Sequence, residues 1–160
     1  MPHDTAALVE ALAAALTARG WMMASAESCT GGLIAGACTD RAGSSDWFER
    51  GFVTYSNAAK SGLLGVPAEL IANHGAVSEP VARAMAAGAV RQAPVQVAVA
   101  VTGVAGPGGG SEAKPVGTVW FGWATPAGVD TECVRFDGDR AAVRQATVAH
   151  ALAGLLQRLR

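Results

Sequence analysis

Apolar side chains recur at the spacing of an α-helix in several stretches of the chain, beginning with residues 5–19. In this stretch Leu8, Leu12, Ala15 and Leu16 share one face, and Gly20 follows as a stop signal. The same spacing, with its capping residues, predicts helices over 30–39, from Asn57 to near Gly65, from Pro67 to near Gly75, from Ser78 to about Arg91 and from Asp139 onward, plus one short helical turn over 44–50.

A second pattern is typical of strands. VQVAVAV at 95–101 is apolar apart from Gln96, as in strands that are buried on both faces, and 51–56 alternates with a period of two. Further strands are predicted over 21–26 and over 116–124 and 129–136, which flank a TPAG turn as an antiparallel hairpin. We therefore expect an α/β fold, a three-layer α/β/α sandwich with a mixed sheet, as one domain over 1–160.

The motif-rich segments follow the carboxyl ends of three predicted strands. These segments are Ser25–Thr30, Tyr55–Lys60 and Val101–Gly110. Ligands of open α/β sheets bind at the carboxyl ends of the strands. The sequence thus predicts a single site where the three segments meet.

Composition narrows the class of protein. Apolar residues make up 51% of the chain and charged residues only 16%, which favours self-association into a dimer or larger homo-oligomer. A net charge of −1 argues against a nucleic-acid partner. Apolar runs are too short for a membrane span, and the N-terminal MPHDTAALVE lacks the basic start of a signal peptide, so we expect a cytoplasmic protein.

The cysteines and histidines do not suggest a metal site. Cys29, Cys38 and Cys133 are odd in number and far apart, and neither a CxxC nor a His–x–Glu spacing occurs. His74 and His150 have no partner at motif spacing, so a Ser–His–Asp triad is not supported either.

The run AESCTGG at 26–32 places Ser28 at the start of a predicted helix, where free N–H groups favour negative charge. Ser28 could act as a nucleophile, with the amides of Thr30, Gly31 and Gly32 near an oxyanion. The alternative is that Ser28 or Thr30 only caps the helix. Cys29 is a second candidate nucleophile, although a small buried thiol is the commoner state of such a residue.

The run GFVTYSNAAK at 51–60 offers a base. Lysine has a reference pKa of about 10.4, so a neutral Lys60 at pH 7 costs roughly 4.6 kcal/mol in water. Burial lowers that pKa, so Lys60 could serve only if it is partly buried and unpaired with a carboxylate. Tyr55 could hydrogen-bond the amine or the hydroxyl. The alternatives are a solvated lysine and a core tyrosine.

Two further features suggest anion binding. TGVAGPGGG at 102–110 follows a buried strand but precedes another strand, so it is neither a Rossmann loop nor a P-loop. Its backbone amides can still bind an anion, with Thr102, Gly103 and Gly106 as candidates; the alternative is a flexible surface loop. Arg140 and Arg144 lie one turn apart at a helix start and suit a phosphate, unless they are simply solvated.

These runs, in this order, resemble the CinA C-terminal domain family, whose stand-alone members are nicotinamide-nucleotide amidohydrolases of the PncC type. The matching runs are AESCTGG, SSDWFERGFVTYSNAAK, LLGV, GAVSEPVARAMAAGA, AVTGVAGPGGGSEAKPVGTVWFGWA and FDGDRAAVRQAT, from residue 26 to about 147. The resemblance implies a three-layer α/β/α fold and hydrolysis of nicotinamide mononucleotide to nicotinate mononucleotide and ammonia. It also implies a place in pyridine nucleotide salvage, with neither metal nor cofactor.

The resemblance also assigns roles to residues. It implies that Ser28 is the nucleophile, Lys60 the base and Tyr55 its assistant, and that Thr102, Gly103 and Arg140 bind the nucleotide. A rival interpretation is a non-catalytic nucleotide-binding module linked to competence or DNA damage. A third is a thiol hydrolase that uses Cys29.

Overall fold

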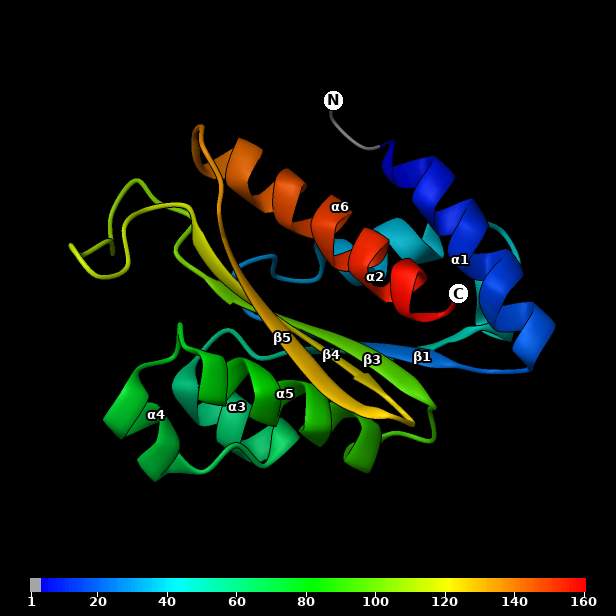
Figure 1. Cartoon of the computed structure of the whole chain (residues 1–160), viewed down its shortest axis with the longest axis horizontal. Coiled ribbons are helices and arrows are strands. Elements are labelled where there is room, and N and C mark those ends of the chain that lie inside the picture. Colours follow the sequence, from blue (N-terminus) through cyan, green and yellow to red (C-terminus); the bar gives the residue numbers. More distant parts are fainter. Residues whose placement is uncertain (1–3) are drawn as a thin grey trace.

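The computed structural model describes residues 4–160, which form five strands and the helices that cover them (Figure 1). Met1–His3, at the start of the segment considered for a signal peptide, lie outside the described residues. The strands are β1 (Met23–Glu27), β2 (Phe48–Val53), β3 (Val97–Gly103), β4 (Thr118–Thr125) and β5 (Gly128–Arg135), in the order β2-β1-β3-β4-β5. Strand β1 is parallel to β2 and β3, whereas β3, β4 and β5 are successively antiparallel, so the predicted mixed sheet is confirmed.

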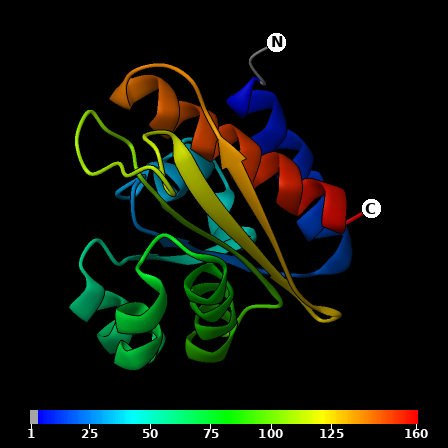
Figure 2. The ribbon, with the colours of Figure 1, turned by 60° about the vertical axis from the view of Figure 1, so that its left-hand side comes forward.

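Helices lie on both faces of the sheet. Helices α1 (Thr5–Arg19), α2 (Leu33–Thr39) and α6 (Arg140–Arg158) cover one face, and α3 (Asn57–Leu64), α4 (Ala68–His74) and α5 (Glu79–Gln92) cover the other (Figures 1 and 2). The predicted three-layer α/β/α sandwich is therefore confirmed. None of the helices in the described part of the chain is long and apolar enough to cross a membrane.

Strand β3 forms the centre of the core, and its alternating residues serve two different layers. Val97, Val99 and Val101 pack with the α1 and α6 side, whereas the smaller Ala98 and Ala100 pack with the α5 side. Small side chains let α5 lie close to the sheet. A Cβ at Gly122 of β4 would stand only 2.6 Å from the carbonyl oxygen of Ala82.

Glycines end the helices where the sequence predicts. Gly20 follows α1 with φ 64° and Gly65 follows α3 with φ 69°, both in the left-handed region that glycine adopts without strain. Asp139 caps α6 through the N–H of Ala142, as predicted. Helix α3 is capped by Ser56, which accepts from the N–H of Ala59, and not by Asn57.

Strand β2 differs from its prediction. It spans Phe48–Val53 instead of 51–56, and only Ser44–Asp46 of the predicted turn over 44–50 is helical, as the 3₁₀ helix η1. Because Ser56 caps α3, the chain leaves the sheet earlier and Tyr55 lies in the connection, 62% exposed. Trp47, which precedes this strand, is buried in the core, and Phe48, its first residue, packs against the same core cluster.

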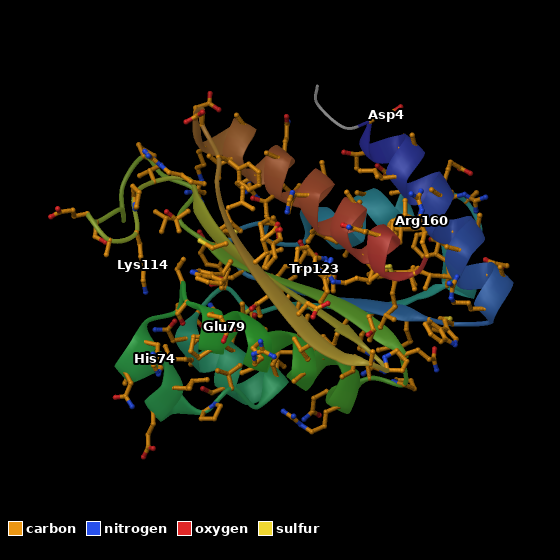
Figure 3. The ribbon with its side chains drawn as sticks, in the orientation of Figure 1. Asp4, His74, Glu79, Lys114, Trp123 and Arg160 are labelled. Carbon is orange, nitrogen blue, oxygen red and sulfur yellow. The ribbon has the colours of Figure 1, made fainter. Side chains whose placement is uncertain are left out.

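The glycine-rich segment after β3 is a long excursion before β4, and it extends away from the sheet at the left of Figure 1. Its two ends are joined by a hydrogen bond of 2.7 Å from the N–H of Gly117 to the carbonyl of Val104. Lys114 points from the loop toward the end of α4 and donates to the carbonyl of His74 at 2.8 Å (Figure 3). The loop is thus tied to the helix layer that also carries Lys60.

Candidate active site

Ser28 stands in the turn that joins β1 to α2. Its own N–H bonds the carbonyl of Val101 at 3.1 Å, which fastens the turn to the central strand. Gly31 and Gly32 have φ values of 56° and 106°, so the turn needs glycine at both positions. Helix α2 begins at Leu33 and not at residue 30, because these left-handed residues separate it from Ser28.

Lys60 reaches Ser28 from the opposite helix layer. Its Nζ lies 3.0 Å from the Ser28 Oγ and 3.0 Å from the backbone carbonyl oxygen of Thr54. Lys60 is 1% exposed and Ser28 is 8% exposed. The predicted meeting of these two side chains is therefore confirmed, and the pair is nearly sealed from water.

The surroundings of Lys60 make its amine easier to deprotonate than that of a lysine in water. Burial lowers the pKa of its amine, since a charge is costly away from water, and the nearby Cys29 opposes this only in part. Among the ion pairs of residues 4–160, none includes Lys60. A lysine base was expected to require burial and the lack of a carboxylate partner. Within residues 4–160, Lys60 meets both requirements.

Tyr55 contacts an arginine instead of the lysine. Its hydroxyl lies 3.2 Å from Nη2 of Arg140, and Nη1 of the same guanidinium donates to the carbonyl of Gly106 at 2.8 Å. Arg140 therefore links the β2–α3 connection to the glycine-rich loop. The expected hydrogen bond from Tyr55 to the amine or the serine is not formed.

A pocket of about 340 Å³ opens beside Ser28 at the carboxyl ends of β1 and β3. Its lining combines the nucleophile candidate, one cation and a stretch of loop backbone: Ser28, Cys29, Tyr55, Val77, Gly103, Val104, Ala105, Gly106, Gly108, Gly109 and Arg140. Of the residues that the sequence singled out, Ser28, Tyr55, Gly103, Gly106 and Arg140 line this pocket. Lys60 is not part of this lining, but its Nζ lies 3.0 Å from the Oγ of Ser28, which is.

Two of the lining glycines are fixed by close packing. A Cβ at Gly103 would lie 2.7 Å from Cγ2 of Val119, and one at Gly106 would lie 2.5 Å from Cγ1 of Val116. Real Cβ atoms do not approach so closely, so any side chain here would displace the loop. These glycines let the loop backbone form a wall of the pocket.

Other predicted binding residues lie outside the pocket and are engaged elsewhere. Thr30 donates to Glu27 at 2.6 Å, and Thr102 donates to the carbonyl of Ala76 at 2.9 Å. The N–H of Gly31 bonds the Ser28 carbonyl, and the N–H of Gly32 bonds Glu27 at 3.2 Å. The expectation that the amides of Gly31 and Gly32 hold an oxyanion is therefore wrong, because internal acceptors occupy them.

Glu27 and Thr54, which sequence reasoning passed over, organise the site together with Arg144. The Glu27 carboxylate lies under the turn, the Thr54 carbonyl holds Lys60, and Arg144 donates to the carbonyls of Cys29 and Thr30 at 3.1 and 3.2 Å. Arg144 is thus a brace for the turn, a role that differs from both alternatives considered for it, a phosphate ligand and a solvated side chain. Only Glu27 left a signal in the sequence, as a lone acid that ends an otherwise uncharged strand.

Cys29 lines the pocket but is not prepared for nucleophilic attack. Burial raises the pKa of its thiol to about 11, so the thiolate is scarce at neutral pH. Burial likewise raises the pKa of Cys38 to about 12. Within residues 4–160, no group of three or more His, Cys, Asp or Glu side chains is arranged to hold a metal ion.

Comparison with known proteins places these features in a family. The model of the CinA C-terminal domain matches residues 5–159. The chain is 60% identical to the nicotinamide-nucleotide amidohydrolase PncC of Enterobacter agglomerans, over 83% of the chain and 82% of that protein. It is 56% identical to the protein of the same name from Escherichia coli (strain K12), over 94% of the chain and 92% of that protein.

A solved structure shares the whole architecture. The competence/damage inducible protein CihA of Agrobacterium tumefaciens superposes with a TM-score of 0.94 at 47% identity, over 98% of this chain and 96% of that one. The match therefore covers the sheet, both helix layers and the loops that form the pocket.

Proposed function

Because the chain belongs to the CinA C-terminal domain family, we propose that it is an amidohydrolase that converts nicotinamide mononucleotide to nicotinate mononucleotide and ammonia. The observation that carries the proposal is the buried 3.0 Å approach of Lys60 Nζ to Ser28 Oγ. A lysine that is desolvated and lacks a carboxylate partner can lose its proton and act as a base. The reaction is a step of pyridine nucleotide salvage.

In the first half of the reaction, the neutral Lys60 amine takes the hydroxyl proton of Ser28. The Ser28 oxygen then attacks the carboxamide carbon of the nicotinamide ring. As the tetrahedral intermediate collapses, the carbon–nitrogen bond breaks and Lys60 returns the proton to the departing amino group, which leaves as ammonia. The Thr54 carbonyl accepts a hydrogen bond from Lys60 throughout and keeps its nitrogen directed at the serine.

In the second half, water hydrolyses the ester between Ser28 and the nicotinoyl group. Lys60 takes a proton from the water, the hydroxide attacks the ester carbon, and the proton passes to the Ser28 oxygen as the carbon–oxygen bond breaks. The products are nicotinate mononucleotide and the free serine. One lysine therefore serves both half-reactions.

The oxyanion requires donors other than those the sequence suggested. Glu27 and Ser28 already accept the amides of Gly31, Gly32, Ile34 and Ala35. We assign the role to the N–H groups of Cys29 and Thr30, which follow the nucleophile directly. Arg144 binds the Cys29 carbonyl, so the Thr30 N–H of the same trans peptide points away from Arg144.

Arg140 is suited to the phosphate of the nucleotide. It is the one charged residue in the pocket lining, and its present partners are a neutral phenol and a carbonyl, with no carboxylate among them. A guanidinium in this state can form charge-assisted hydrogen bonds with a phosphate. Tyr55 then has the role of orienting Arg140, and binding of the remote phosphate orients the amide over Ser28.

An ammonia-release assay on nicotinamide mononucleotide tests the proposal. The wild-type protein should release ammonia, and Ser28→Ala should lower the rate at least about 10³-fold because the nucleophile is lost. Cys29→Ala is the matched neighbour and should keep most of the activity, since the Cys29 thiol stays protonated.

Other outcomes would support the rival functions. Tight binding of the mononucleotide by wild-type protein without turnover would favour a nucleotide-binding module. Loss of activity in Cys29→Ala with retention in Ser28→Ala would favour a thiol hydrolase. Full activity in Ser28→Ala would end the proposal.

A further inference from the structure

Glu27 is a fully buried acid directly beside the candidate nucleophile. It ends β1 with 0% exposure, and its carboxylate accepts hydrogen bonds from two hydroxyls and three backbone amides. Oε1 accepts from the Thr30 hydroxyl at 2.6 Å, from the Gly32 amide at 3.2 Å and from the Ile34 amide at 2.9 Å. Oε2 accepts from the Ser25 hydroxyl at 3.2 Å and from the Ala35 amide at 3.0 Å.

The charge of this carboxylate is balanced by dipoles. In residues 4–160 no salt bridge includes Glu27. The amides that it accepts lie at the start of α2, where the unpaired N–H groups of a helix carry partial positive charge. A buried carboxylate is tolerated when hydrogen bonds replace its hydration, and amide donors to a charged acceptor are stronger than neutral pairs.

These bonds fix the turn that carries Ser28. Thr30 and Gly32 lie within the turn, and Ile34 and Ala35 lie in the first turn of α2, so the carboxylate joins the end of β1 to the start of the helix. Ser28 is the residue next to Glu27, with little freedom once both ends of the turn are held. Arg144 braces the same turn from α6 through the Cys29 and Thr30 carbonyls.

The backbone of Glu27 is also connected to the lysine side of the site. Its carbonyl accepts from the N–H of Thr54 at 2.7 Å and from the Thr54 hydroxyl at 3.3 Å. The carbonyl of Thr54 in turn accepts from Lys60 at 3.0 Å. One residue therefore contacts both the turn that carries the serine and the segment that directs the amine.

We propose that Glu27 is a positioning residue for the reaction, which holds Ser28 at attack distance from Lys60 and the substrate through its hydrogen bonds to the turn and to α2. It touches no reacting atom. Its test by turnover rests on the proposed function. Its test by covalent labelling of Ser28 rests only on the reactivity of that serine.

The variant Glu27→Gln tests the hydrogen bonds of this residue while it keeps the size of the side chain. Glutamine has nearly the same shape, but its NH₂ group donates where the second carboxylate oxygen accepted. If its oxygen faces Thr30, Gly32 and Ile34, its NH₂ meets the Ala35 N–H, which cannot turn to accept. The start of α2 must then shift, and a displacement of about 1 Å at a reacting group can lower a rate about 100-fold.

Two rates are measured on folded protein, with Glu79→Gln as the matched control. Glu79 lies at the start of α5 and bonds Arg83 and Thr131, outside the pocket lining (Figure 3). The first rate is that of the deamidation of nicotinamide mononucleotide, resolved into kcat and KM. The second is inactivation by a fluorophosphonate, in which the Ser28 oxygen bonds phosphorus, fluoride leaves and the hydroxyl proton passes to Lys60.

For Glu27→Gln we expect kcat and the fluorophosphonate rate to fall together, by about 100-fold, while KM stays within about threefold. Glu79→Gln should match the wild type in both rates. A merely structural role predicts fewer folded molecules that each react at the wild-type rate. Wild-type kcat and labelling in folded Glu27→Gln would therefore overturn the proposal.

The same measurements separate this proposal from the proposed function. If the wild type reacts with the fluorophosphonate but releases no ammonia, the substrate is wrong, and slower labelling of Glu27→Gln still supports the positioning role. If Glu27→Gln does not fold, Glu27→Asp is measured in the same way. Its carboxylate keeps the charge but is one methylene shorter, so we expect a folded protein with both rates lowered at least tenfold, and wild-type rates would overturn the proposal.

Discussion

At the scale of single residues, burial changes what Lys60 can do. In water a lysine at neutral pH is almost wholly protonated and has no lone pair to offer. Here the side chain is 1% exposed and touches a hydroxyl and a carbonyl, so desolvation lowers its pKa. The same burial that raises the pKa of Cys29 to about 11 thus makes the lysine a better base and the thiol a poorer nucleophile.

The lowered pKa of Lys60 predicts the pH dependence of the reaction. Below that pKa the amine is protonated and inactive, so kcat/KM should rise tenfold per pH unit and then level off above it. The midpoint should lie below the 10.5 of an unperturbed lysine. A pH profile of ammonia release measures it, and a rate that falls as pH rises through this range would contradict a lysine base.

Lys60→Arg should be inactive at every pH tested, because arginine keeps its proton. The chain has only one other lysine, Lys114, which binds the His74 carbonyl away from the pocket lining. Lys114→Arg is therefore the matched control and should keep the wild-type pH profile.

At the scale of elements, the distance between serine and lysine depends on how α3 packs. Helix α3 carries Lys60 and rests on α5, where Gly88 faces the end of α3. A Cβ at Gly88 would stand 2.1 Å from the carbonyl oxygen of Leu64. Because Gly88 of α5 has no side chain, α3 can pack closely against α5. This packing helps to set the distance between the Lys60 amine and Ser28.

Two glycine substitutions on these facing helices should have opposite effects. Gly88→Ala should lower the free energy of unfolding by about 1–3 kcal/mol, because α3 must move away from α5. Gly62→Ala, in α3 itself, meets nothing within 4 Å and should raise it by about 0.5–1 kcal/mol. Urea denaturation measures both changes, and equal stability of the two variants would show that the close contact does not limit the packing.

At the scale of the whole molecule, several large apolar side chains are exposed on the surface. Leu33, Val53 and Leu63 are 41%, 46% and 48% exposed. Strand β2, which ends at Val53, forms one edge of the sheet, with an open row of backbone groups. The low charge content of the sequence points in the same direction.

We accordingly predict that the chain self-associates in solution. One chain has a mass of 16.1 kDa, so sedimentation equilibrium at micromolar concentration should give a multiple of this value. Val53→Asp, which places a charge at the exposed end of the edge strand, should lower the measured mass if this edge takes part. A wild-type mass of 16.1 kDa at all concentrations would contradict the prediction.

Local sequence patterns determined most of the helices and strands of this chain. Periodic apolar residues located α1, α3, α5 and α6, and glycines marked the ends of α1 and α3, because helix formation and termination depend on neighbours within one turn. The apolar run of β3 identified the central strand. The order of elements implied that the motifs would meet at the carboxyl ends of the strands.

Only the tertiary structure decided how the polar side chains pair. Tyr55 bonds Arg140, 85 positions away, and Arg144 bonds the turn 114 and 115 positions earlier, so no local pattern could reveal either contact. The amides of Gly32, Ile34 and Ala35 were open donors in the sequence and are occupied in the fold, because the Glu27 carboxylate is buried beneath them. The sequence determined which groups are present at the carboxyl ends of the strands. Burial, which is a property of the packed chain, determined their charges and partners.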